Sequence, residues 1–284
     1  MRKQLATLLS ATVCLLAPHA LAKPKTVDIN FAAAVNGQPL HCGTAYDNVG
    51  STGATLKLQD FRIFVSALRW IDDQGREVPA KLVADGVWQD NKVALIDFED
   101  GTGNCNGNSA LHTKVTLEAP KANYKGLVFE VGVPFDINHQ DPTLAPAPLN
   151  VPATAWPWRI GFKFTTIDLA TSPAPGKTAT ASGFSIHLGS TGCGAGAITT
   201  APTVACSNPN RPEYRLSSFE ARTHVVVFDL GDLLAQTDIT ANAPQSAPGC
   251  MAFEDDDDCI AIMDRFGLPF RGKPSAGQHF VSVR

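Results

Sequence analysis

Residues 124–137 read YKGLVFEVGVPFDI, and large apolar side chains occupy every second position from 127 to 135. These side chains are Leu127, Phe129, Val131, Val133 and Phe135. An alternation with a period of two residues is typical of a β-strand that buries one face in a core. This stretch therefore predicts a strand, and the same kind of segment recurs along most of the chain.

The recurring segments are separated by turn residues, with no amphipathic helices between them. They read TVDINFAAAV (26–35), LKLQDFRIFVSALRWI (56–71), NKVALIDFED (91–100), LHTKVTLEA (111–119), WRIGFKFTTIDL (158–169), GFSIHLGS (183–190), EYRLSSFEA (213–221) and THVVVFDLGDLL (223–234). A succession of short strands with no helices between them is typical of sandwiches and barrels. We expect an all-β fold, a Greek-key β-sandwich or barrel with long loops, formed by a single domain over residues 23–284.

Two segments depart from the strand pattern. Residues 138–155 form a proline-rich stretch that predicts a long, stiff loop, and long ordered loops often carry function. Residues 258–266 predict a short C-terminal helix that Asp258 caps, with Ile260 and Met263 on its apolar face and Gly267 after its end.

The N-terminus has the features of a secretory signal peptide. A basic Met-Arg-Lys start precedes an apolar run that ends in Ala20-Leu21-Ala22, so we expect residues 1–22 to be removed and the protein to be periplasmic or secreted. The formal charge then changes from −4 to −6, because Arg2 and Lys3 are lost. This mild acidity and the absence of a basic patch argue against nucleic acid as a partner. The apolar run is too short and too poorly flanked for stable membrane insertion.

Six cysteines follow the signal peptide, and none of them forms a C-x-x-C pair. An even number in an exported protein indicates disulfides rather than a metal site. Proximity in the sequence suggests Cys193–Cys206 and Cys250–Cys259, which leaves Cys42 for Cys105. There is no G-x-S-x-G motif, and oxidised cysteines are not nucleophiles, so we do not expect an enzyme.

Histidines are the most informative polar residues. His187 points away from the apolar face of its predicted strand, and His139 opens the proline-rich loop that leads to Trp156. Two neutral imidazoles beside an aromatic wall suit Cu(I) or Cu(II). His139 and His187 are therefore candidate copper ligands, and His41 is a weaker candidate.

Acidic segments offer an alternative function. Asp97 and Asp100 lie in a segment with oxygen ligands and turn glycines, and residues 254–258 read EDDDD between two cysteines. Carboxylates attract calcium, although neither segment matches the twelve-residue calcium loop. The alternative is therefore a calcium-stabilised adhesion or structural domain without copper, in which Asp97 and Asp100 are the candidate ligands.

An ordered set of motifs covers most of the chain from about residue 27 to residue 270. The motifs are WQDNKVALIDFEDGTGNC, YKGLVFEVGVPFDINHQD, APLN, WPWRIGFKF, IHLGSTGC, Cys206 with NPNR, and GCMAFEDDDDC followed by FGLPF. Together they resemble the MbnP family, the four-cysteine members of the metallo-mystery pairs. The resemblance implies an exported copper-binding protein whose partner is MbnH, a di-haem enzyme of the MauG and cytochrome c peroxidase type. The family is also related to the copper proteins MopE and CorA.

The resemblance also implies site residues and a covalent modification. In these relatives a tryptophan is oxidised to kynurenine, whose amine joins histidines around copper. In this chain the NHQD and HLGSTGC motifs place His139 and His187 in the ligand roles. The WPWRIGFKF motif offers Trp156 or Trp158 for oxidation, and Trp156, at the end of the proline-rich loop, is the slightly better candidate. The family's four cysteines correspond to Cys193, Cys206, Cys250 and Cys259. The chain departs from the family at Pro157 and at Phe162, where a small residue and a tyrosine are usual.

Overall fold

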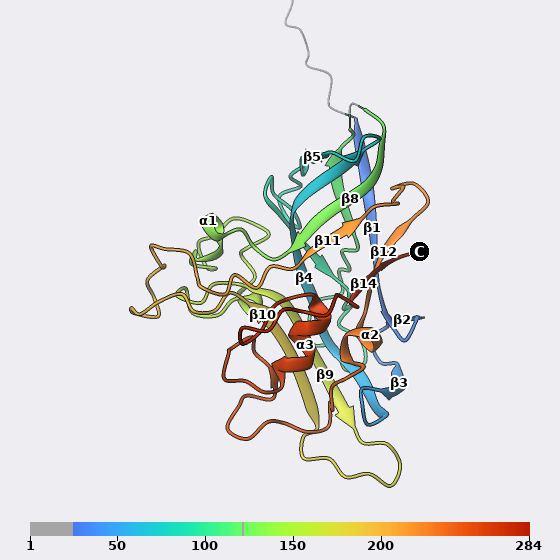
Figure 1. Ribbon diagram of the computed structural model, residues 1–284, viewed down its shortest axis with the longest axis vertical. Coiled ribbons are helices and arrows are strands. Elements are labelled where there is room, and N and C mark those ends of the chain that lie inside the picture. Colours follow the sequence, from blue (N-terminus) through green and yellow to red (C-terminus); the bar gives the residue numbers. More distant parts are fainter. Residues whose placement is uncertain (1–24, 121) are drawn as a thin grey trace, which may run out of the picture.

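The computed structural model describes residues 25–120 and 122–284, so the predicted signal peptide at residues 1–22 lies outside the described part (Figure 1). One of its two sheets is built around the first strand, β1. This strand pairs in parallel with β12 on one side and antiparallel with β2 and β7 on the other. The strands of this sheet are β1 (Thr26–Val35), β2 (Gln38–Pro39), β7 (Lys114–Glu118), β12 (Val225–Asp229) and β14 (Val281–Val283).

The larger sheet is organised by one long strand, β4, to which five other strands bond. A bulge near Ala67, whose φ is 51°, separates the part of β4 that pairs with β9 from most of the part that pairs with β8. The strands of this sheet are β3 (Ala45–Val49), β4 (Ala54–Asp72), β5 (Glu77–Pro79), β6 (Val93–Asp97), β8 (Tyr124–Val131), β9 (Lys163–Ser172), β10 (Gly183–Gly189), β11 (Glu213–Leu216) and β13 (Gly249–Cys250).

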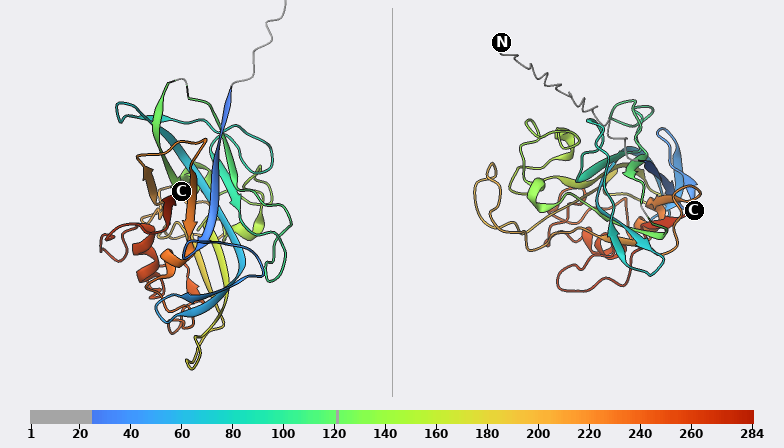
Figure 2. Two further views of the ribbon diagram at one scale, coloured as in Figure 1. Left: turned by 90° about the vertical axis from the view of Figure 1, so that its right-hand side faces the viewer. Right: turned by 90° about the horizontal axis from the view of Figure 1, so that it is seen from above.

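An aromatic core joins the two sheets. The ring of Phe228 on β12 is fully buried and lies within 6.4 Å, between centroids, of rings from both sheets and from two loops. These neighbours are Phe31, Phe61, Phe98, Phe129 and Phe280. The alternation first seen in residues 124–137 is confirmed for Leu127, Phe129, Val131 and Val133, which are fully buried. Two details differ: Val128 on the opposite face is also fully buried, and Phe135 is 40% exposed because it begins α1 instead of extending the strand. The all-β prediction is confirmed, and the two curled sheets are visible from two further directions in Figure 2.

The helices are short: α1 (Phe135–Asn138), the 3₁₀ turn η1 (Pro152–Thr154), α2 (Leu230–Leu234) and α3 (Cys259–Phe266). The predicted C-terminal helix is therefore confirmed as α3, but two details differ. Ile260 is 52% exposed, because the buried face is formed by Cys259, Ile262, Met263 and Phe266. Asp258 makes no capping bond to the helix. Among the described residues, no helix is long and apolar enough to cross a membrane.

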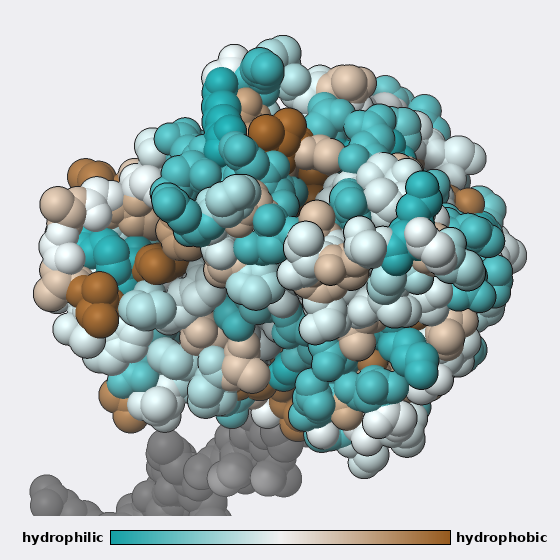
Figure 3. Space-filling view, turned by 90° about the horizontal axis from the view of Figure 1, so that it is seen from below, coloured by the Kyte–Doolittle hydropathy of each residue, from teal (hydrophilic) through white to brown (hydrophobic). Residues whose placement is uncertain are grey.

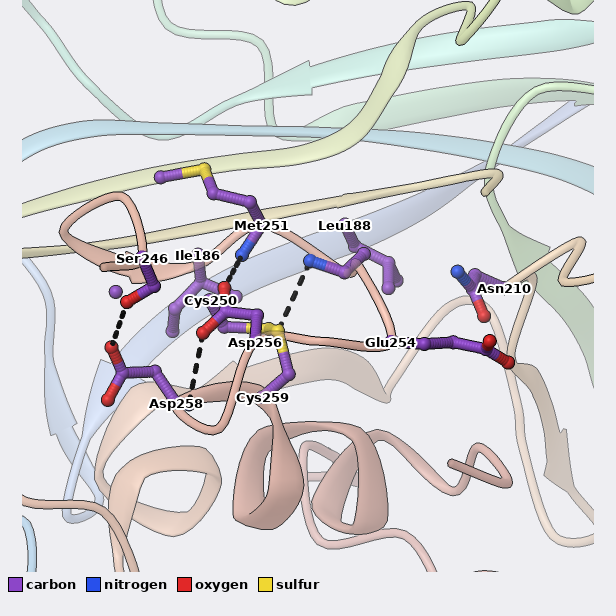
Figure 4. Close-up of a disulfide and its surroundings, with 12 residues drawn as sticks. Ile186, Leu188, Asn210, Ser246, Cys250, Met251, Glu254, Asp256, Asp258 and Cys259 are labelled. Atoms are coloured by element: carbon purple, nitrogen blue, oxygen red, sulfur yellow. Dashed lines mark hydrogen bonds between the residues drawn. A yellow bond between two sulfur atoms is a disulfide. The ribbon is translucent and has the colours of Figure 1, made fainter. Parts of the chain in front are cut away.

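Three disulfides tie the loops to the sheets, and all three predicted pairings are confirmed: Cys42–Cys105, Cys193–Cys206 and Cys250–Cys259. The Cys250–Cys259 bond fastens β13 to the start of α3 (Figure 4). Cys193 and Cys206 close a loop that projects from the same side of the molecule as α1 (Figure 1). This side, where β9 begins and β10 ends, carries the candidate site.

Candidate metal centre

The segment AWPWRIGFKF forms a tight turn that leads into β9. Ala155 and Phe162 form a β-bridge, and the Trp156 N–H donates to the Gly161 carbonyl at 3.0 Å. The Ile160 N–H donates to the Pro157 carbonyl at 2.8 Å, which turns the chain between them. β9 therefore begins at Lys163 rather than at residue 158 as expected, and this turn removes Trp158 and Ile160 from the strand face.

Trp156 is half-buried and packs against the end of β10. Its ring centroid lies 6.4 Å from that of His187 and 6.0 Å from that of Phe253. Gly189 makes this packing feasible, because a Cβ at this position would lie 2.4 Å from Cζ3 of Trp156. The glycine of the HLGS motif thus lets an indole lie directly on the strand.

A carboxylate holds the His187 ring. Nε2 of His187 lies 2.9 Å from Oδ1 of Asp168 on β9, which also accepts from the Ser185 hydroxyl at 2.5 Å. Burial opposes ionisation of Asp168, but the hydrogen bonds from His187 and Ser185 and the charge of Lys163 lower its pKa overall. An ionised carboxylate only accepts hydrogen bonds, so Nε2 carries a proton. In the neutral imidazole, Nδ1 then has the lone pair that can bind a metal.

His139 is buried just after α1 and has a different set of neighbours. Its Nδ1–H donates to the Trp158 carbonyl at 2.8 Å, so Nε2 holds the lone pair. Nε2 lies 3.4 Å from the Asn138 amide nitrogen and 3.7 Å from Sγ of Cys206. Burial, aided by the charge of Arg159, lowers the pKa of His139 and favours the neutral ring. The ligand role of His139 beside His187 remains a prediction.

The other predicted ligands lie elsewhere. His41 is exposed next to the Cys42–Cys105 disulfide, where its charge acts on Asp100. Asp97 is buried and accepts from the backbone N–H of Glu99, while Asp100 bonds the backbone and hydroxyl of Thr102. Both carboxylates thus already accept hydrogen bonds from the protein. Calcium binding by Asp97 and Asp100 remains a prediction.

The acids of the EDDDD segment have structural roles. Asp256 accepts from the backbone N–H groups of Met251 and Asp258, and Asp258 accepts from the Ala243 N–H and the Ser246 hydroxyl (Figure 4). The Asn208 side chain donates to Glu254 at 3.2 Å. These bonds fold the loop around the Cys250–Cys259 disulfide, and calcium binding by this loop remains a prediction.

Comparison with known proteins identifies the family. The MbnP family profile matches residues 24–252, which include the Trp156 turn, Asp168 and His187. The chain belongs to the MbnP family. The fold is similar to the solved structure of MbnP from Methylosinus trichosporium, with 33% identity, a TM-score of 0.80, and coverage of 92% of this chain and 99% of that chain. A comparison with curated proteins found no significant match.

Within this MbnP domain, sequence reasoning missed two residues beside Trp156 and His187. Asp168 stands in the middle of β9, a strand otherwise rich in apolar and Thr side chains, and an acid in such a strand signals a bonded partner. Phe253 directly precedes the acidic run, and no periodic pattern includes it. Its position against Trp156 depends on the Cys250–Cys259 loop, whose path the sequence does not reveal.

Proposed function

We propose that this MbnP-family protein is an exported copper-binding protein and that copper is bound beside Trp156 after this residue is oxidised to kynurenine. The observation that carries the proposal is the packing of Trp156 on His187, whose ring is oriented by Asp168. A histidine that donates one N–H to a carboxylate and offers the other nitrogen is a common arrangement at metal sites. The three disulfides support folding in an oxidising compartment such as the periplasm.

Oxidation would give Trp156 a ligand atom that it lacks. The indole N–H only donates a hydrogen bond, so an intact tryptophan offers copper no nitrogen lone pair. Removal of four electrons, with two oxygen atoms supplied by water, cleaves the C2–C3 bond of the indole. Hydrolysis then releases C2 as formate and leaves kynurenine with a free aromatic amine. The amine forms at a half-buried ring next to His187, so the two nitrogen ligands arise on neighbouring elements.

The oxidant in this proposal is a di-haem enzyme of the MbnH type, which accepts the four electrons across a protein interface. Exposed apolar side chains on the surrounding loops offer a surface for such a contact. Figure 3 shows hydrophobic surface at the edge from which these loops project. The exposed apolar side chains on the loops around the site are Phe135 (40% exposed), Leu144 (83%), Ile198 (63%), Val204 (68%) and Phe253 (37%).

The test is co-expression with the di-haem partner, followed by peptide mass spectrometry and copper analysis. Kynurenine has one oxygen more and one carbon less than tryptophan, so the modified residue is heavier by about 4 Da. Fragmentation should place this gain on Trp156, and copper should co-purify with the modified chain. Trp156→Phe should abolish both signals, whereas the matched control Trp158→Phe should retain them. A gain on Trp158 alone, or copper retained in His187→Gln, contradicts the proposed site.

A further inference from the structure

A second set of metal ligands surrounds the Cys193–Cys206 disulfide. Nε2 of His139 and the two sulfur atoms all lie within 4.8 Å of one another, and the three residues are buried. The Nδ1–H of His139 is used by the Trp158 carbonyl, so the Nε2 lone pair is on the side of the sulfurs. Asp168 and His187 are not members of this cluster.

The spacing in this cluster matches that of ligands on one metal ion. Nε2 of His139 lies 3.7 Å from Sγ of Cys206. Metal bonds of about 2.3 Å to sulfur and about 2.0 Å to nitrogen, at angles of about 110–120°, place these two ligand atoms about 3.5–3.7 Å apart. The observed distance between Nε2 of His139 and Sγ of Cys206 therefore suits two ligands of the same metal ion.

We propose that reduction of the Cys193–Cys206 disulfide creates a Cu(I) site formed by the two cysteine thiolates and Nε2 of His139. Two electrons and two protons from an external dithiol break the S–S bond, and the dithiol becomes a disulfide. Cu(I) then displaces the two thiol protons. Thiolates and imidazole are ligands that Cu(I) favours, whereas the disulfide form leaves His139 as a single ligand. The oxidation state of this disulfide thus decides whether the second site exists.

The backbone keeps the two cysteines together after reduction. Thr191 and Asn208 form a β-bridge, with N–H to carbonyl distances of 2.9 and 3.1 Å, and Ser207 donates to Gly192 at 3.0 Å. Cys193 and Cys206 follow directly, with their Cα atoms 3.9 Å apart. Small rotations about the Cα–Cβ bonds separate the sulfurs while these hydrogen bonds hold the hairpin.

A reductant has a path to this disulfide. Cys193 lines a cavity of about 440 Å³ together with Arg159, Gly194 and Phe253. Residues 194–201 of the closed loop are exposed. Cys250 and Cys259 are 1% and 0% exposed, so the disulfide beside His139 is more accessible than theirs. Cys42 is partly exposed, so a reductant also reaches the Cys42–Cys105 bond, and the variant lacking Cys193 and Cys206 controls for copper bound there.

The inference does not depend on tryptophan oxidation. The test therefore uses the full chain expressed without the di-haem partner, with the Trp156 site removed by Trp156→Phe and His187→Gln. After mild reduction and anaerobic removal of reductant, Cu(I) is titrated against a chromophoric Cu(I) chelator. We expect one Cu(I) per chain with thiolate-to-copper absorption in the ultraviolet, and no such absorption in the oxidised chain. Adding His139→Gln should weaken binding at least about tenfold, and adding Cys193→Ser with Cys206→Ser should abolish it.

A single substitution tests the ligands without reductant. Cys193→Ser frees the Cys206 thiol beside His139 and leaves the other two disulfides closed, so this variant should bind Cu(I) as purified. Adding His139→Gln to it should weaken that binding about tenfold or more. Equal affinity with and without His139, or full binding by the reduced chain that lacks both cysteines, overturns the proposal. A failure of copper binding at the Trp156 site leaves these results unaffected.

Discussion

Asp97 provides the sharpest test of the energetics of this fold. Its carboxyl is 1% exposed at the end of β6 and accepts the Glu99 N–H at 3.1 Å. Burial raises the pKa of Asp97 from 3.8 to about 7, aided by the charges of Glu99 and Asp60 and opposed by the hydrogen bond from the Glu99 N–H and by the charge of Arg62. Asp97→Asn keeps the shape and the accepting oxygen and removes the ionisation.

The sign and size of the effect follow from linkage between protonation and folding. Between pH 3.8 and about 7 the folded chain keeps this proton and the unfolded chain loses it, so the free energy of unfolding falls as the pH rises. A shift of about 3 pKa units corresponds to about 4 kcal/mol of lost stability above pH 7. The amide of the Asp97→Asn variant does not ionise and avoids this loss. The variant should therefore be the more stable protein at pH 8, and its advantage should shrink by about 1.4 kcal/mol per pH unit below pH 7.

The assay is urea denaturation of both proteins at pH 8, 7, 6 and 5, followed by far-ultraviolet circular dichroism. Asp100→Asn is the control, because the bonds of this partly exposed neighbour to Thr102 lower the pKa of Asp100, and removing its charge should give no gain in stability at pH 8. A stability difference that does not change with pH refutes the reasoning. If calcium stabilises the wild type relative to chelator and this gain is lost in Asp97→Asn, Asp97 binds calcium instead.

Further predictions concern the core and the site. Phe228→Ala removes the ring that contacts five aromatic neighbours and should lower the free energy of unfolding by about 3–5 kcal/mol in urea titrations; a loss below about 1 kcal/mol contradicts the described core. Asp168→Asn removes the charged acceptor that orients His187 and should weaken copper binding by the kynurenine form about 10–100-fold in chelator competition, with Tm little changed. Gly189→Ala places a methyl group against Trp156 and should shift tryptophan fluorescence and reduce oxidation of Trp156 by the partner, and unchanged fluorescence is inconsistent with the described packing.

The fold was largely predictable because its strands carry strong alternation around turn residues. The alternation from Leu127 to Val133 is buried as expected, and the three disulfides join the predicted partners. The start of β9 was not predictable, because Pro157 and Gly161 turn the chain within a segment whose side chains alternate like those of a strand. An alternating pattern of apolar side chains predicts a strand, but it does not show where the chain turns within that pattern.

The candidate site was predictable in its parts and not in its arrangement. Trp156 and His187 were both named from the sequence, and their contact depends on the pairing of β9 with β10 and on the absence of a side chain at Gly189. The position of His139 beside Cys206 is set by the path of two long loops, which no local pattern encodes. Tertiary packing decides which residues far apart in the sequence come into contact, so residue types alone do not reveal these contacts.

The pairing of β1 has a consequence for how the chain acquires its structure. Asn30 to Ala34 of β1 align with Val225 to Asp229 of β12, although β1 is the first described strand and β12 is one of the last. Contacts between such distant segments slow folding, because a long loop must close before they form. A chain that crosses a membrane from its N-terminus thus remains without its β1–β12 pairing until β12 has also crossed. With export as proposed, the β1–β12 pairing is therefore completed only on the far side of the membrane.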